Sequence, residues 1–181
     1  YYADTTYGDV EHYRPKGFYQ QQKGDKQNSP GYYWLAYKWD NLMYACEKCN
    51  RTYKKNYFPL KDPNKRFDKD LRNISQEEPL LINPYEEKEP KNHLTFVKNR
   101  IFSLTDEGEF SIEYYGLDRE ELNESRLHVY NEINNLAELL QIAKGSKLEQ
   151  PTMDKLKRTI KDCLSKGRYT LMIKCNFGQY L

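Results

Sequence analysis

The chain has 181 residues, 38% of them hydrophobic, and a formal net charge of +2 at pH 7. This length suffices for one packed domain, or for a small catalytic unit with an added helical part. The near-neutral charge excludes nucleic-acid binding through bulk charge, so such binding needs a local basic patch. No apolar run approaches the length of a membrane span and no stretch resembles a signal peptide, so we expect a cytoplasmic protein without a membrane partner.

The first sixty residues predict two short strands followed by a short helix. Residues 1–20 are expected to form an extended segment that ends at Pro15, because proline cannot continue the interior of a sheet. Residues 41–45 predict the second strand, and residues 49–57 a helix that ends before Pro59. An aromatic run between the strands is expected to belong mostly to the core; it contains Tyr32, Tyr33, Trp34, Tyr37 and Trp39.

The remainder predicts a β region followed by helices. The charged residues 60–79 are expected to form a surface excursion. Residues 93–97, 100–104 and 110–115 predict strands, with a hairpin turn at 106–108. From residue 118 the apolar residues recur at helical spacing to about residue 144, and again over 153–164. The sequence therefore predicts an α+β fold in three parts: 1–60, 61–117 and 118–181.

The first part contains the residue types that hydrolyse a phosphodiester. His12 is the only histidine before His93, and an unperturbed pKa of ~6.5 suits a general base. The side-chain oxygens of Glu11 and Asn50 are hard ligands suited to Mg²⁺ or Mn²⁺, and Asn41 could orient the His12 ring. Because neighbours on a strand face opposite sides, Glu11 and His12 can serve one site only at a strand end.

Two further groups of residues flank this set. Cys46 and Cys49 have the spacing of a zinc knuckle, but a closed structural Zn²⁺ site takes four ligands. The chain begins at Tyr1 without a methionine, so a second thiol pair could lie upstream. A phosphate clamp is expected from five basic residues: Arg14, Lys16, Arg51, Lys54 and Lys55.

Each of these features also has an ordinary structural interpretation. A single histidine is more often a surface residue, a single Cys-x-x-Cys is weak evidence, and Asn41 could simply cap a turn. The order and spacing of the whole set nevertheless favour a nuclease, because they match a strand–strand–helix metal finger.

The motifs resemble the HNH (ββα-metal) endonucleases, and in particular the nuclease subunit of Septu-type anti-phage systems, some of which are attached to retrons. The similarity lies in residues 11–16 (Glu-His-Tyr-Arg-Pro-Lys), 39–42 (Trp-Asp-Asn-Leu) and 46–50 (Cys-Glu-Lys-Cys-Asn). It continues in the Asn-Pro and His-Leu-Thr-Phe motifs at 83–84 and 93–96, and in Gly-Leu-Asp-Arg at 116–119.

The resemblance implies a ββα-metal finger with an added small β region and C-terminal helices. His12 would be the general base, Asn41 its orienting residue, and Glu11 with Asn50 the ligands of the catalytic Mg²⁺ or Mn²⁺. Cys46 and Cys49 would be half of a structural zinc site. The implied partners are DNA, an ATPase subunit, and a retron reverse transcriptase with its DNA. Residues 118–181 are where we expect the ATPase contact.

The predicted function is metal-dependent hydrolysis of DNA as the effector of a defence complex. Two alternatives stay open. The first is an RNA nuclease acting on tRNA, for example, because a phosphate clamp binds both polymers. The second is a non-catalytic, zinc-stabilised module that binds nucleic acid or a partner.

Overall fold

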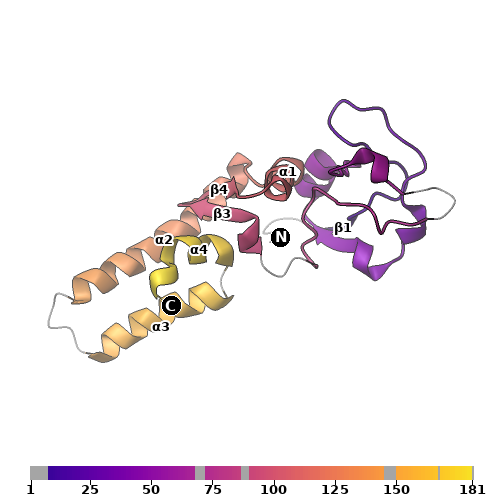
Figure 1. Cartoon of the computed structure of the whole chain (residues 1–181). Helices are drawn as coiled ribbons and strands as arrows, with labels where there is room; N and C mark the ends of the chain where they lie inside the picture. The colour runs from indigo at the N-terminus through magenta and orange to yellow at the C-terminus, as the bar shows by residue number, and fades with distance from the viewer. Residues whose placement is uncertain (1–7, 68–71, 87–89, 145–149, 167, 181) are drawn as a thin grey trace. The chain divides into compact units, whose positions relative to one another are not determined.

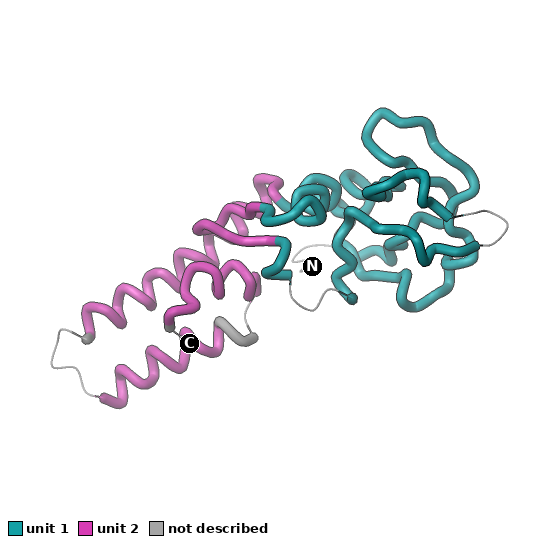
Figure 2. Tube along the Cα trace, viewed as in Figure 1, with its two compact units in different colours: residues 1–93, 103–117 teal, residues 94–102, 118–181 magenta. Residues whose placement is uncertain are grey.

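The computed structural model describes residues 8–67, 72–86, 90–144, 150–166 and 168–180. The chain forms two compact units, one of residues 1–93 and 103–117 and the other of residues 94–102 and 118–181 (Figure 2). The first unit ends at residue 117, and within it residues 1–60 are grouped with residues 61–93. The segment 94–102 belongs to the second unit instead of the predicted middle part.

The first unit begins with an antiparallel hairpin followed by a helix (Figure 1). Strand β1 (Asp9–His12) pairs with β2 (Leu42–Ala45) so that Glu11 lies opposite Met43 and His12 opposite Leu42. Next comes η3 (Lys48–Lys54), a π-helix, a form that often occurs at functional sites. The predicted order of two strands and a helix is confirmed. The other short helices described in this unit are η1 (Tyr33–Leu35), η2 (Trp39–Asn41), η4 (Pro63–Lys65) and η5 (Pro90–Asn92). A further short helix, η6 (Gly178–Tyr180), belongs to the second unit.

The core of the first unit is aromatic and contains a buried carboxylate. The Tyr32 ring packs against the rings of Phe58 and Phe67. Glu77 lies beside them, where it accepts hydrogen bonds from the hydroxyl of Tyr32 at 2.8 Å and from Nε of Arg14 at 3.1 Å. The prediction of a surface excursion over 60–79 is therefore wrong for Phe67 and Glu77, whose side chains are buried.

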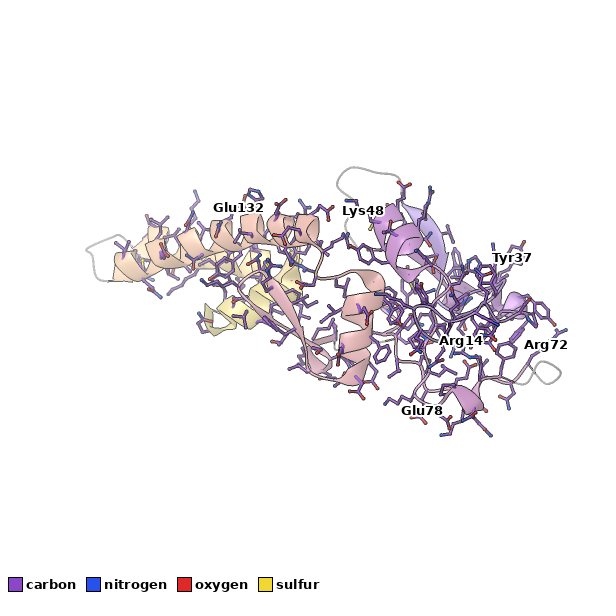
Figure 3. All side chains as sticks on the ribbon, turned by 90° about the horizontal axis from the view of Figure 1, so that it is seen from above. Arg14, Tyr37, Lys48, Arg72, Glu78 and Glu132 are labelled. Carbon is purple, nitrogen blue, oxygen red and sulfur yellow. The ribbon has the colours of Figure 1, made fainter. Side chains whose placement is uncertain are left out.

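The aromatic run between the strands divides into buried and exposed rings. Tyr32 is fully buried, but Tyr37 is 97% exposed and Trp39 is 87% exposed. In Figure 3, Tyr37 lies at the edge of this unit while Arg14 lies among densely packed side chains. The prediction that the run belongs mostly to the core is therefore wrong for Tyr33, Tyr37 and Trp39, which are all exposed.

The expected third strand at 110–115 is instead the last part of helix α1 (Asp106–Tyr115). The side chain of Thr105 caps this helix by accepting a hydrogen bond from the Gly108 backbone N–H at 3.2 Å. Three acidic residues in the first turn stabilise the helix through their interaction with the positive N-terminal end of its dipole. The helix ends at Gly116, whose φ of +60° suits glycine. The residues expected to form a hairpin turn are therefore the capped first turn of a helix.

The second unit is a hairpin with three helices. The hairpin is formed by β3 (Leu94–Val97) and β4 (Arg100–Ser103), close to the predicted strands. The two predicted helices are present as α2 (Glu120–Lys144) and α3 (Gln150–Lys166). A third helix, α4 (Thr170–Phe177), was not predicted. The core of this unit is aliphatic and includes Ile133, Leu140, Ile160, Met172 and Ile173. Within the described ranges, no helix is long and apolar enough to cross a membrane.

Candidate active site

A polar cleft lies where the end of β1 meets η3. Its volume is about 300 Å³. It brings together the predicted base, both predicted metal ligands and three of the predicted clamp residues. The lining residues are Glu11, His12, Pro15, Lys16, Asn50, Arg51, Lys55 and Asn56.

His12 is the last residue of β1, so strict strand alternation does not keep it away from Glu11, and both line the cleft. The Nε2 atom of His12 lies 3.0 Å from the backbone oxygen of Ala36. A carbonyl oxygen can only accept, so this partner assigns the ring proton to Nε2. Nδ1 is then the unprotonated nitrogen in the neutral ring, the state that a general base needs.

Glu11 is buried and forms an ion pair with Lys54. The Lys54 Nζ lies 2.8 Å from Oε1 of Glu11 and 3.0 Å from the backbone oxygen of His12. The Lys54 side chain is only 1% exposed, and burial lowers the pKa of its ammonium. The structure therefore corrects the prediction that Lys54 binds phosphate: it joins η3 to the two residues that would carry the chemistry.

Asn50 reaches the cleft from η3 and is oriented by an acid that sequence reasoning missed. Its Nδ2 donates to Oδ2 of Asp9 at 3.0 Å, which leaves the carboxamide oxygen as the atom that can bind a cation. Asp9 also accepts two hydrogen bonds from Arg51, at 2.9 Å each, and these hold its pKa below the usual value. Asp9 stands two residues before Glu11 on β1, so alternation places both acids on the η3 side of the hairpin. That spacing could have predicted it.

Asn41 does not hold the His12 ring directly, because the ring is hydrogen-bonded to the backbone oxygen of Ala36 instead. The buried side chain of Asn41 accepts from the Arg14 backbone N–H at 2.8 Å and donates to the backbone oxygens of Arg14 at 3.1 Å and Leu35 at 3.2 Å. It thereby ties the end of β1 to the segment that contains Ala36. Its effect on the ring is indirect.

The predicted phosphate clamp divides into exposed and buried residues. Lys16, Arg51 and Lys55 are exposed at the cleft. Arg14 is not available, because its guanidinium pairs with the buried Glu77 and lies over the rings of Tyr13 and Phe58. The prediction is therefore wrong for Arg14 as it is for Lys54.

The residues present fit a magnesium-type ion better than a structural zinc ion. Glu11 and Asn50 offer two hard oxygen ligands in a cleft with room for bound water, as Mg²⁺ prefers. Cys46 and Cys49 form a knuckle in which the Cys49 N–H donates to the Cys46 sulfur at 3.3 Å. Among the described residues, no group of three or more His, Cys, Asp or Glu side chains could hold a metal, either at this knuckle or in the cleft, where one of the two oxygen ligands is a carboxamide. The knuckle alone does not make a closed zinc site.

Comparison with known proteins shows that the chain is similar to two Septu proteins, which confirms the Septu part of the resemblance seen in its motifs; the HNH part stays a prediction. It is 42% identical over 132 residues to Septu protein PtuB of Bacillus mycoides (strain KBAB4), covering 71% of this chain and 44% of that protein. It is 28% identical over 134 residues to Septu protein PtuA of the same strain, covering 74% of this chain and 19% of that protein. The chain thus spans less than half the length of either relative. No family model and no solved structure matches it.

Proposed function

We propose that the first unit is a metal-dependent endonuclease with an HNH (ββα-metal) fold that hydrolyses phosphodiester bonds. The observation that supports this is the convergence of His12, Glu11 and Asn50 on one cleft from two separate elements, β1 and η3. Sequence separates Glu11 from Asn50 by 39 positions (50 − 11), so their meeting is a product of folding.

In the proposed mechanism, Nδ1 of His12 takes a proton from a water molecule aimed at the phosphorus. The Ala36 carbonyl keeps the other ring nitrogen protonated and stabilises the imidazolium that forms. Glu11 and Asn50 would hold the Mg²⁺ or Mn²⁺ ion, which would neutralise charge on the phosphoryl and leaving oxygens. Lys16, Arg51 and Lys55 would bind the flanking phosphates.

The homology supports a role for this activity in anti-phage defence. We propose that the chain is the nuclease effector of a Septu-type complex, with an ATPase subunit as partner and, where a retron is attached, its reverse transcriptase and DNA. DNA is the favoured substrate. RNA stays the second candidate, because the exposed residues of the cleft would contact phosphates, which both polymers carry.

The proposal is tested by cleavage of labelled DNA and RNA with Mg²⁺ or EDTA. We expect cleavage that EDTA abolishes, and at least a hundredfold loss in His12→Ala, the range for removing a general base. His128→Ala is the matched control, because His128 is exposed on α2 of the other unit. Undiminished cleavage by His12→Ala would overturn the mechanism. Binding without metal-dependent turnover would favour the non-catalytic module.

A further inference from the structure

The β1–β2 hairpin of the first unit carries a second hollow, which is apolar and larger than the cleft. Its volume is about 720 Å³, and its lining residues are Val10, Trp39, Asp40, Leu42, Met43, Tyr44 and Tyr85. Four of these side chains are unusually exposed for their type: Trp39 at 87%, Val10 at 68%, Tyr85 at 61% and Tyr44 at 50%. We call this surface the aromatic groove. A contiguous exposed apolar surface of this kind typically marks a binding site, whereas isolated exposed apolar residues are common on any protein.

The groove lies on the opposite face of the β1–β2 hairpin from η3, and two of its lining residues are close to the candidate base in the sheet. Val10 and Tyr44 are cross-strand partners, and both alternate with the buried residues of the other face. Val10 stands two residues before His12 on β1. Leu42, another lining residue, is the cross-strand partner of His12. The strand register therefore places the edge of the aromatic groove beside His12, which lines the cleft.

Two of the aromatic residues of the groove, Tyr44 and Tyr85, are held in place by local contacts. Tyr44 lies so close over Gly8 that a Cβ there would come within 2.1 Å of its ring. The Tyr44 backbone N–H donates to the Tyr85 hydroxyl at 3.4 Å, and the Tyr85 backbone N–H donates to Oδ1 of Asn83 at 3.1 Å. A preformed surface loses little conformational entropy on binding, so these contacts favour a recognition role.

The chemistry of the groove favours flat, unsaturated ligands. Three of its exposed walls are aromatic, and stacking on such rings is how proteins bind unpaired bases without sequence preference. Asp40, the charged member of the lining, can accept a hydrogen bond from an exocyclic amine such as cytosine N4. Basic residues are in the cleft instead, where phosphates would lie. The aromatic groove therefore suits the bases of a nucleic-acid strand, and the basic cleft suits its phosphates.

We propose that the aromatic groove stacks unpaired bases of the strand whose backbone occupies the cleft, so that the substrate is single-stranded near the scissile phosphate. This inference rests on the proposed nuclease function. It restricts the substrate to DNA or RNA with an unpaired segment, such as a loop, an end or a displaced strand. A fully paired duplex presents no free base faces and would bind more weakly.

The experiment uses Trp39 as its own reporter. The chain has two tryptophans, and Trp34→Phe leaves Trp39 as the sole one. In EDTA, which prevents turnover, this variant is titrated with a single-stranded DNA oligonucleotide, with an abasic chain of the same length and charge, and with the matching duplex. We expect the fluorescence of Trp39 to be quenched by the single strand alone, and the single strand to bind about tenfold or more tightly than the abasic chain.

A parallel measurement does not depend on the Trp34 substitution. By anisotropy of a labelled single strand, Trp39→Ala in the otherwise unchanged chain should weaken binding roughly 5- to 150-fold, the range for losing one stacked base. Tyr37→Ala is the matched control, because Tyr37 is an exposed aromatic outside the groove lining, and it should bind as the parent does. Circular dichroism verifies that both variants fold.

The outcomes separate this inference from the proposed function. Equal binding of the single strand and the abasic chain, with Trp39→Ala binding as the parent does, would overturn base stacking even if His12-dependent cleavage is observed. The groove would then be a surface for an apolar protein segment. Failure to bind any of the three polymers would overturn base stacking, whereas the nuclease function would still be decided by the cleavage assay.

Discussion

Replacing Lys54 with methionine should strongly destabilise the first unit. Methionine keeps most of the side-chain volume but removes the ammonium that lies 2.8 Å from Oε1 of Glu11. The side chains of Lys54 and Glu11 are only 1% and 9% exposed, so water would compensate only weakly for the lost partner. Removing one member of a buried ion pair costs about 3–5 kcal/mol, because the other charge is left uncompensated. That is a large part of the ~5–15 kcal/mol that stabilises a whole domain.

The loss is measured by urea unfolding at pH 7 in EDTA, followed by near-ultraviolet circular dichroism of the aromatic core. With an m-value of about 2 kcal/mol/M, a loss of 3–5 kcal/mol lowers the midpoint by about 1.5–2.5 M. Lys55→Met is the matched control, because Lys55 is the exposed neighbour, and it should change stability by less than about 0.5 kcal/mol.

A double variant tests the physical reason. Glu11→Leu combined with Lys54→Met replaces both charges with apolar groups and should recover most of the stability, since buried pairs are often no better than apolar substitutes. If Lys54→Met unfolds within about 1 kcal/mol of the parent, the ion pair does not hold the hairpin to η3. The proposed orientation of Glu11 would then lose its support.

Four smaller effects are expected from single contacts. Asn41→Ala leaves buried backbone groups unpaired and should lower the free energy of unfolding by roughly 1–3 kcal/mol, measured in urea, with a loss of cleavage because the Ala36 segment is released. Thr105→Ala removes the α1 cap and should cost about 1 kcal/mol in the same assay. Gly116→Ala places a Cβ within 2.5 Å of the Tyr53 ring at a positive φ, so its thermal midpoint should fall by several degrees, more than for Thr105→Ala. The hydrogen bond from Lys61, as the largest cause, together with those from the backbone and Thr105, lowers the pKa of Glu107 from 4.5 to about 2, so this carboxylate contributes stability that is present above pH 4.5 and lost as pH falls toward 2. Lys61→Met should flatten that part of the pH–stability curve; an unchanged curve would contradict the assignment.

Local signals predicted the elements that carry the site, whereas long-range pairing decided what surrounds it. Pro15 was enough to predict an extended segment before it, within which β1 lies, and the apolar spacing after residue 118 was enough for α2. The segment around Glu77 could not be placed, because its partners Arg14 and Tyr32 are 63 and 45 positions away. Charge alone made it look like a surface loop. Burial of a carboxylate is favourable only when such partners meet it, and no local pattern encodes that.

Two neighbouring lysines of the first unit also show that local sequence does not determine which side chain is buried. Lys54 and Lys55 are adjacent in sequence, yet one is buried against Glu11 and the other is exposed at the cleft. Neighbours on a helix point in different directions, so identical residue types there need not share a role. The buried acid on β1 decides which lysine turns inward, since only a paired charge is tolerated in the core. In the proposed mechanism, phosphate binding therefore falls to Lys55 and its exposed neighbours, while Lys54 holds the acid on which metal binding would depend.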